Sequence, residues 1–201
     1  MIDIPNMKEL QAEVRPKLFD SLEQRKYSPE ELRDLDKPII ERLAKREAFE
    51  PLDDTKKKEL KDLGYSEDVI EAVGSNEEAD IYMGADLESK SLNDREVLVK
   101  KDIDLEQQDD FGATNLERME NGKPPLDKDG RPIELHHIGQ KNDAPLAELS
   151  KSEHTGDGND KVLHDKTKES EIDRTGFAKE RAEHWQARAE DIKQQAGTEN
   201  G

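Results

Sequence analysis

Two adjacent histidines, His136 and His137, lie in residues 134–140 (ELHHIGQ) and offer this sequence its clearest chemistry. A neutral imidazole nitrogen binds transition metals, and it also accepts a proton near neutral pH. Hydrolysis of a phosphodiester needs a cation for the developing negative charge and a base for the attacking water. The pair could supply one of each if the strand ends or twists there, since regular alternation would separate the two rings. Gly139, just downstream, favours such a strand end.

A metal ion needs further ligands, and His154 and His164 are available. His154 is the last residue of 146–154, a segment with the pattern of a short helix or turn, and His164 lies beyond the loop-like segment 155–161 (TGDGNDK). Asn159 lies in that segment and could brace it through side-chain hydrogen bonds. The chain contains no cysteine, so thiolate metal sites and disulfides are excluded.

Three other polar side chains lie near enough in sequence to assist. Lys161 borders the same loop at a plausible phosphate-binding position, and Arg174 could reach a substrate phosphate or simply pair with a neighbouring carboxylate. Gln140 could orient a ligand or merely end the strand. His184 lies beside Trp185, and such a histidine is more often packed or exposed than catalytic.

Composition and charge divide the chain into two regions. Of its 201 residues, 31% are hydrophobic and 41% are charged, which predicts a small core with much solvated helix. Residues 1–110 carry 18 Lys and Arg against 31 Asp and Glu, whereas residues 111–201 carry 14 against 19 and hold all five histidines. This asymmetry predicts an acidic module over 1–110 and a second module over 111–201. Alternatively, the acidic residues are only a solvated helical surface.

The expected secondary structure fits a mostly helical first region. Helical patterns run through residues 6–63, after Ser66 and over 77–84, and residues 95–101 (REVLVKK) are the best strand. In the second region, Thr114 opens a short helix with a capping box. The Asp129-Gly130 turn predicts a β-hairpin over 124–138, and residues 169–195 predict one long helix.

These motifs together resemble the LHH family of nuclease toxins in the HNH/endonuclease VII superfamily. The similar segment covers about residues 109–190. Its matching pieces are DGRPI, Leu135-His136-His137, Ile138-Gly139-Gln140, PLAEL, Glu153-His154, Leu163-His164, SEIDR, Phe177 and Trp185. The resemblance implies a ββα-metal (His-Me finger) fold. We therefore expect an α+β chain, in which the acidic helical region precedes a small ββα-metal nuclease module with a long C-terminal helix.

The same resemblance implies roles for individual residues. His136 would be a metal ligand and His137 the general base, while His154 and His164 would bind the metal or contact phosphate. Which of these two binds the metal directly is left open. Asn159 would be the bracing asparagine of the superfamily. The implied cofactor is a divalent ion such as Zn, Mg, Mn or Ni.

The implied function is metal-dependent DNA cleavage by an antibacterial toxin. Such toxins are delivered into a target bacterial cell, act in its cytoplasm and are neutralised by a cognate immunity protein. Two alternatives remain: an RNase of the same fold, and a non-catalytic interaction protein whose histidines hold a structural metal. The net charge of −18 opposes nucleic-acid binding. The sequence shows no signal peptide, and no stretch approaches the roughly 18 apolar residues of a membrane span.

Overall fold

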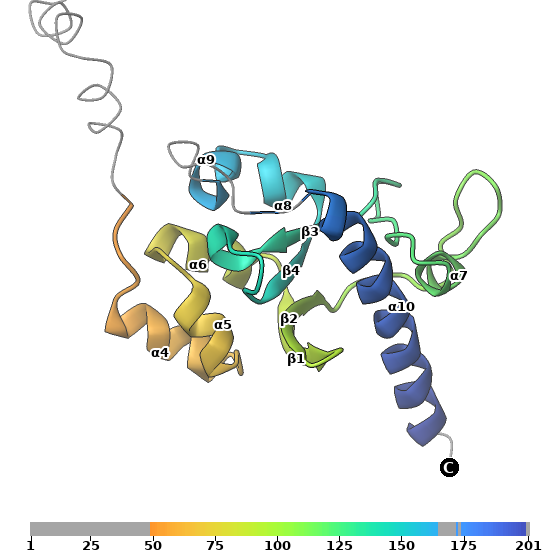
Figure 1. Cartoon of the computed structure of the whole chain (residues 1–201), viewed down its shortest axis with the longest axis horizontal. Helices are drawn as coiled ribbons and strands as arrows, with labels where there is room; N and C mark the ends of the chain where they lie inside the picture. The colour runs from red at the N-terminus through yellow and green to blue at the C-terminus, as the bar shows by residue number, and fades with distance from the viewer. Residues whose placement is uncertain (1–48, 165–171, 173, 200–201) are drawn as a thin grey trace, which may run out of the picture. The chain divides into compact units, whose positions relative to one another are not determined.

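The computed structural model describes residues 49–164, 172 and 174–199 (Figure 1). Phe49–Gly201 form one compact unit of mixed α/β architecture with a long C-terminal helix, which confirms the predicted fold class. The predicted helical pattern before residue 49 lies outside the described residues, as do residues 169–171 of the predicted C-terminal helix. In the described part of the chain, no helix combines the length and apolar character needed to cross a membrane.

Three short helices open the described chain and confirm the predicted helical pattern there. They are α4 (Asp54–Asp62), α5 (Glu67–Ala72) and α6 (Asn76–Gly84). Each begins at an N-cap whose side-chain oxygen accepts a backbone N–H of the first turn, namely Asp53, Ser66 and Ser75.

Four strands form one sheet in the order β1-β2-β4-β3. Their bounds are Leu87–Leu92 for β1, Arg95–Lys100 for β2, Glu134–His137 for β3 and Leu146–Leu149 for β4. The central pair β2 and β4 is parallel, and the two outer pairs are antiparallel. β2 confirms the predicted strand over 95–101, whereas β1 was not predicted. β2 precedes residue 110 in the sequence and β4 follows it, yet the two strands pair. The predicted boundary between residues 110 and 111 therefore lies inside this compact unit.

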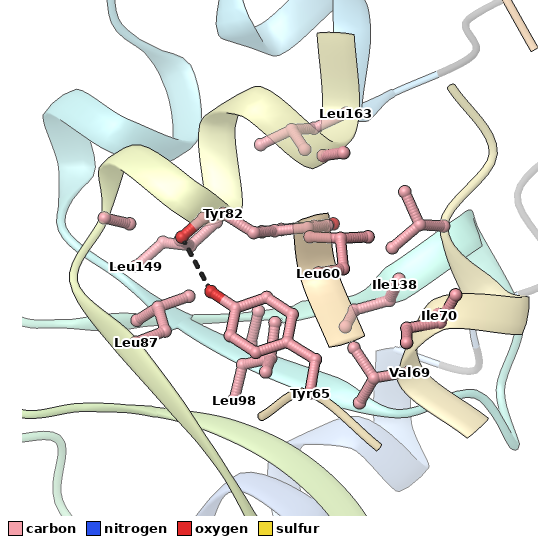
Figure 2. Close-up of a cluster of buried hydrophobic side chains, with 14 residues drawn as sticks. Leu60, Tyr65, Val69, Ile70, Tyr82, Leu87, Leu98, Ile138, Leu149 and Leu163 are labelled. Carbon is pink, nitrogen blue, oxygen red and sulfur yellow. Dashed lines mark hydrogen bonds between the residues drawn. The ribbon is translucent and has the colours of Figure 1, made fainter. Parts of the chain in front are cut away.

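Helices α4, α5 and α6 cover one face of the sheet. Alternation along β2 turns Leu98 toward this face, where it joins Tyr65 and Tyr82 in the buried cluster of Figure 2. The Tyr65 hydroxyl donates a 3.0 Å hydrogen bond to the carbonyl oxygen of Tyr82. Ile138 and Leu163 belong to the same cluster. Ile138 directly follows His137, and Leu163 directly precedes His164. Packing on this face therefore fixes the chain where the candidate site begins.

Helices α7 (Asn115–Glu120) and α10 (Arg174–Glu199) pack on the opposite face. Val97 and Val99 of β2 turn toward them and meet Met119 and Trp185, both of which are almost fully buried. The predicted capping box at Thr114 is present at the start of α7. The sheet is thus enclosed between two helical layers (Figure 1).

The predicted hairpin over 124–138 forms only next to its turn. Its turn is present, since Asp127 and Arg131 are joined by a backbone hydrogen bond, but only one bridge, Leu126 with Pro132, follows it. The Ile133 N–H also donates to the carbonyl oxygen of Pro125 at 2.9 Å, but no further pairing in this described part of the chain continues the hairpin. β3 pairs instead with β4, which lies in the segment predicted to be a short helix or turn. β4 is buried on both faces, and this tertiary environment outweighs its local helical pattern.

The helical part of that segment is α8 (Lys151–Thr155), which starts at a capping box formed by Ser150 and Glu153. The predicted loop 155–161 ends early, because α9 spans Asn159–Leu163. β3, β4 and α8 follow one another and make the ββα unit that was expected, although its strands are not those of the predicted hairpin.

Candidate active site

Three histidine rings from three elements meet beside β3. His136 lies on β3, His154 on α8 and His164 just after α9, and each offers one nitrogen within 4.8 Å of the others. His136 Nδ1 and His154 Nε2 are 3.2 Å apart. Two nitrogens bound at about 2.0–2.1 Å to one tetrahedral zinc ion would be about 3.3 Å apart. The spacing of this pair is therefore that of two ligands of one ion.

The second nitrogen of two of these rings has a defined environment. His154 Nδ1 lies 2.6 Å from Glu134 Oε2, and a carboxylate in this position holds the ring so that Nε2 faces the group. His164 Nδ1 lies 3.2 Å from Asp160 Oδ1. His136 Nε2 is buried and has no hydrogen-bond partner among the described residues.

Electrostatics keep the group ready to bind a cation. Burial, and then the neighbouring histidines, hold the pKa of His136 well below its ordinary value of 6.5. Burial likewise lowers the pKa of His164, with His154 contributing. A metal binds only the neutral imidazole. Because the pKa values of His136 and His164 are lowered, protons compete little with a metal for these two rings near neutral pH. Three imidazole ligands suit a transition metal such as zinc or nickel better than magnesium. The residues present thus fit the divalent ion that was predicted.

Backbone geometry at the end of β3 prepares this arrangement. The strand ends at His137, as predicted, and the following 3₁₀ turn η1 (Ile138–Gln140) places Gly139 at φ 69°. A Cβ at Gly139 would lie 2.7 Å from the carbonyl oxygen of Ala72, so only glycine fits this turn.

Two predicted assisting residues brace the histidines from nearby. Gln140 Nε2 donates to the carbonyl oxygen of Leu163 at 3.1 Å and so ties the turn to the residue before His164. Asn159 Nδ2 donates to the carbonyl oxygen of Glu153 at 2.8 Å and ties α9 to α8. Both contacts orient the chain around the group, and neither residue belongs to the set of three nitrogens.

His137 faces the other side of the sheet. Its ring packs 4.6 Å from the ring of Phe177 on α10, whereas the ring of His136 lies 6.5 Å from that of Tyr82 in the opposite layer. The strand end therefore does not bring both rings to one side, because the two residues still alternate within β3. Burial, with the positive charge of Arg95 second, lowers the pKa of His137 to about 4. The ring is neutral at pH 7 and able to accept a proton.

Lys161 and His184 are not part of this group of three histidines. Lys161 is exposed on α9. Arg174 is the first residue of α10, and its side chain lies outside the described residues. His184 lies on α10 and is buried against the sheet, with Nε2 2.9 Å from Glu148 Oε1 of β4, and takes a structural position.

Sequence reasoning missed the partners of His137. Glu180 on α10 places Oε2 3.2 Å from His137 Nε2, and Arg95 on β2 forms an ion pair with the same carboxylate. A carboxylate on the predicted long helix was a weak signal, because that helix carries several others. Only the packing of α10 on the sheet selects Glu180.

Glu134→Gln is expected to weaken metal binding by about 10- to 100-fold, the usual effect of losing a carboxylate that orients a ligand histidine. His154→Ala should weaken it further, because that substitution removes a ligand. Calorimetric titration of the metal-free protein with Zn²⁺ measures both variants. Affinities equal to that of the wild-type protein would show that His154 is no ligand.

Comparison with known families matches residues 114–191 to LHH, described as a nuclease of the HNH/ENDO VII superfamily with conserved LHH. The match contains Leu135-His136-His137, both other histidines of the group and most of α10. It leaves out β1, β2 and the helices α4, α5 and α6, which pack in the same unit. No solved structure matches the chain.

Proposed function

Residues 114–191 form an LHH domain of the HNH/ENDO VII nuclease superfamily, and from this premise we propose that the chain is a metal-dependent endonuclease that cleaves DNA. One observation carries the proposal: His136, His154 and His164 converge within 4.8 Å, and His137, the next residue of β3, is buried and neutral on the opposite face of the sheet. Either feature alone is compatible with a structural site. Together, at the end of one strand, they could supply the cation and the base that phosphodiester hydrolysis needs.

The proposed chemistry divides the two tasks between the faces of β3. His136, His154 and His164 would hold a divalent ion, which when bound supplies positive charge to the phosphate and its leaving oxygen. His137 takes the proton of the attacking water. A phosphodiester that contacts both the three histidines and His137 has to lie across the end of β3, where the 3₁₀ turn η1 follows the strand.

The proposed biological role is that of an antibacterial toxin, delivered into a bacterial cell and neutralised by a cognate immunity protein. The family match supports nuclease activity, and the likeness of the LHH segment to nuclease toxins suggests the role. The acidic net charge predicts weak, salt-sensitive binding of nucleic acid, because the phosphates are repelled over much of the surface.

Purified full-length protein is expected to nick supercoiled plasmid in the presence of Zn²⁺, Ni²⁺, Mn²⁺ or Mg²⁺, and to stop when a chelator is added. Zn²⁺ and Ni²⁺ should bind most tightly, because the ligands are imidazoles. Agarose electrophoresis of plasmid and of total RNA, run in parallel at low salt, measures the activity.

If total RNA is cleaved while the plasmid stays intact, the substrate is RNA, and the proposed hydrolytic chemistry is unchanged. Tight metal binding without cleavage of either polymer would overturn the nuclease proposal and leave a structural metal site.

A further inference from the structure

Three charged or polar side chains from three elements meet on the face of the sheet opposite the metal-binding group. Glu180 of α10 lies between His137 of β3 and Arg95 of β2. Its two oxygens are used separately, since Oε1 pairs with Arg95 Nη1 and Oε2 lies 3.2 Å from His137 Nε2. The Glu180 side chain is only 27% exposed and that of His137 4%.

Arg95 is held in place independently of Glu180. Its Nε donates to the carbonyl oxygen of Ala144 at 2.8 Å, and Nη2 donates to that of Asn142 at 2.7 Å. Guanidinium groups donate and never accept, so Glu180 Oε1 has to remain an acceptor toward Arg95. This fixes which carboxylate oxygen is left for His137.

The surroundings of the His137 ring limit the hydrogen bonds that it can make. Phe177 packs against the ring, and Nε2 is buried without a regular hydrogen bond to the described residues. Glu180 Oε2 lies 3.2 Å from this nitrogen, so the carboxylate is the polar group beside it. A carboxylate accepts only, so it favours the tautomer with the proton on Nε2 and the lone pair on Nδ1.

We propose that Glu180, fixed by Arg95, is a positioning residue that holds His137 in the Nε2–H tautomer and leaves Nδ1 to accept the proton of water. The inference rests on the proposed nuclease function for its kinetic consequence. Its structural content, the tautomer of His137, does not depend on activity.

The test compares two replacements of Glu180 in the full-length protein. In Glu180→Gln, the amide oxygen stays with Arg95, so the NH₂ group faces His137 Nε2. That group donates, which moves the ring proton to Nδ1 and blocks the base. Glu180→Ala only removes the orienting partner. We expect kcat to fall by roughly 100-fold or more in Glu180→Gln and less in Glu180→Ala, with KM little changed in either.

Glu183→Gln is the matched control, because it makes the same chemical change on the same helix at a side chain that is 54% exposed. Its kinetics should equal those of the wild-type protein. In a His137→Ala background, Glu180→Gln should cause no further loss, since the two residues act as a unit. A simple structural role predicts instead that alanine harms more than the isosteric glutamine, and that the losses add.

Nitrogen-15 NMR of the metal-free protein reads the tautomer directly. In the wild-type protein the ring proton of His137 should be on Nε2. In Glu180→Gln the tautomer with the proton on Nδ1 should become more populated. An unchanged tautomer, or a kcat order with alanine below glutamine, would overturn the inference. A wild-type protein without any cleavage, but with the expected tautomer change, would overturn the nuclease proposal and leave the role of Glu180 toward His137 standing.

Discussion

Replacing His137 by alanine is expected to lower phosphodiester cleavage by about 10²–10⁴-fold, the usual contribution of a well-placed acid–base group. The ring is neutral at pH 7, because burial and Arg95 lower its pKa to about 4, and alanine offers no nitrogen to replace it. Cleavage of plasmid under single-turnover conditions measures the loss. The same substitution should also abolish the growth inhibition expected when the wild-type chain is produced in bacterial cytoplasm.

The metal site should survive this substitution, since His137 lies on the opposite face of β3 from the three converging nitrogens. Zn²⁺ affinity by calorimetry should stay close to that of the wild-type protein, and circular dichroism should show an unchanged fold. A folded, metal-binding His137→Ala protein that nicks plasmid at the normal rate would remove His137 from the role of base.

Replacing Glu148 by alanine is expected to lower the free energy of unfolding by about 3–5 kcal/mol, because it removes the buried carboxylate that faces His184, Arg188 and the backbone N–H of Lys100. Glu148 on β4 is fully buried, and Oε1 lies 2.9 Å from His184 Nε2 and 3.5 Å from Arg188 Nε. Its Oε2 accepts the backbone N–H of Lys100 at 2.9 Å. Urea denaturation followed by circular dichroism measures the loss.

Two comparisons make that prediction specific. Glu190→Ala changes an exposed carboxylate on α10 and should alter stability little. A triple variant, Glu148→Leu with His184→Leu and Arg188→Met, replaces the whole buried network by apolar side chains and should regain much of the lost stability. If Glu148→Ala were as stable as Glu190→Ala, the network would not be what fastens α10 to the sheet.

Both predictions concern strand residues whose side-chain partners lie on one helix, α10. α10 brings Phe177 and Glu180 to His137 near its beginning, and it is fastened to the sheet through His184 and Arg188 farther along. Loosening the second contact should therefore also disturb the environment of the catalytic candidate.

The sequence alone determined the local elements and the ligand types. Caps and periodicity predicted α4, α5, α6 and α7, because the hydrogen bonds that start a helix join residues a few positions apart. The strand at Arg95 was visible because its run of apolar, β-branched residues is also a local pattern. The histidines predicted a metal-dependent chemistry, since imidazole is among the few side chains that bind metals and accept protons at neutral pH.

Only the tertiary structure decided which of these parts meet. β2 and β4 pair in parallel across the predicted boundary after residue 110, and a parallel pair is joined by a long connection that leaves no local signature. Glu148 and Glu180 resemble the other carboxylates of a highly charged chain until the packing of α10 buries one and turns the other toward His137. Burial and the choice of charged partner depend on residues far apart in sequence. Caps, turns and periodicity do not carry that information, so this part of the site could be read only from the folded chain.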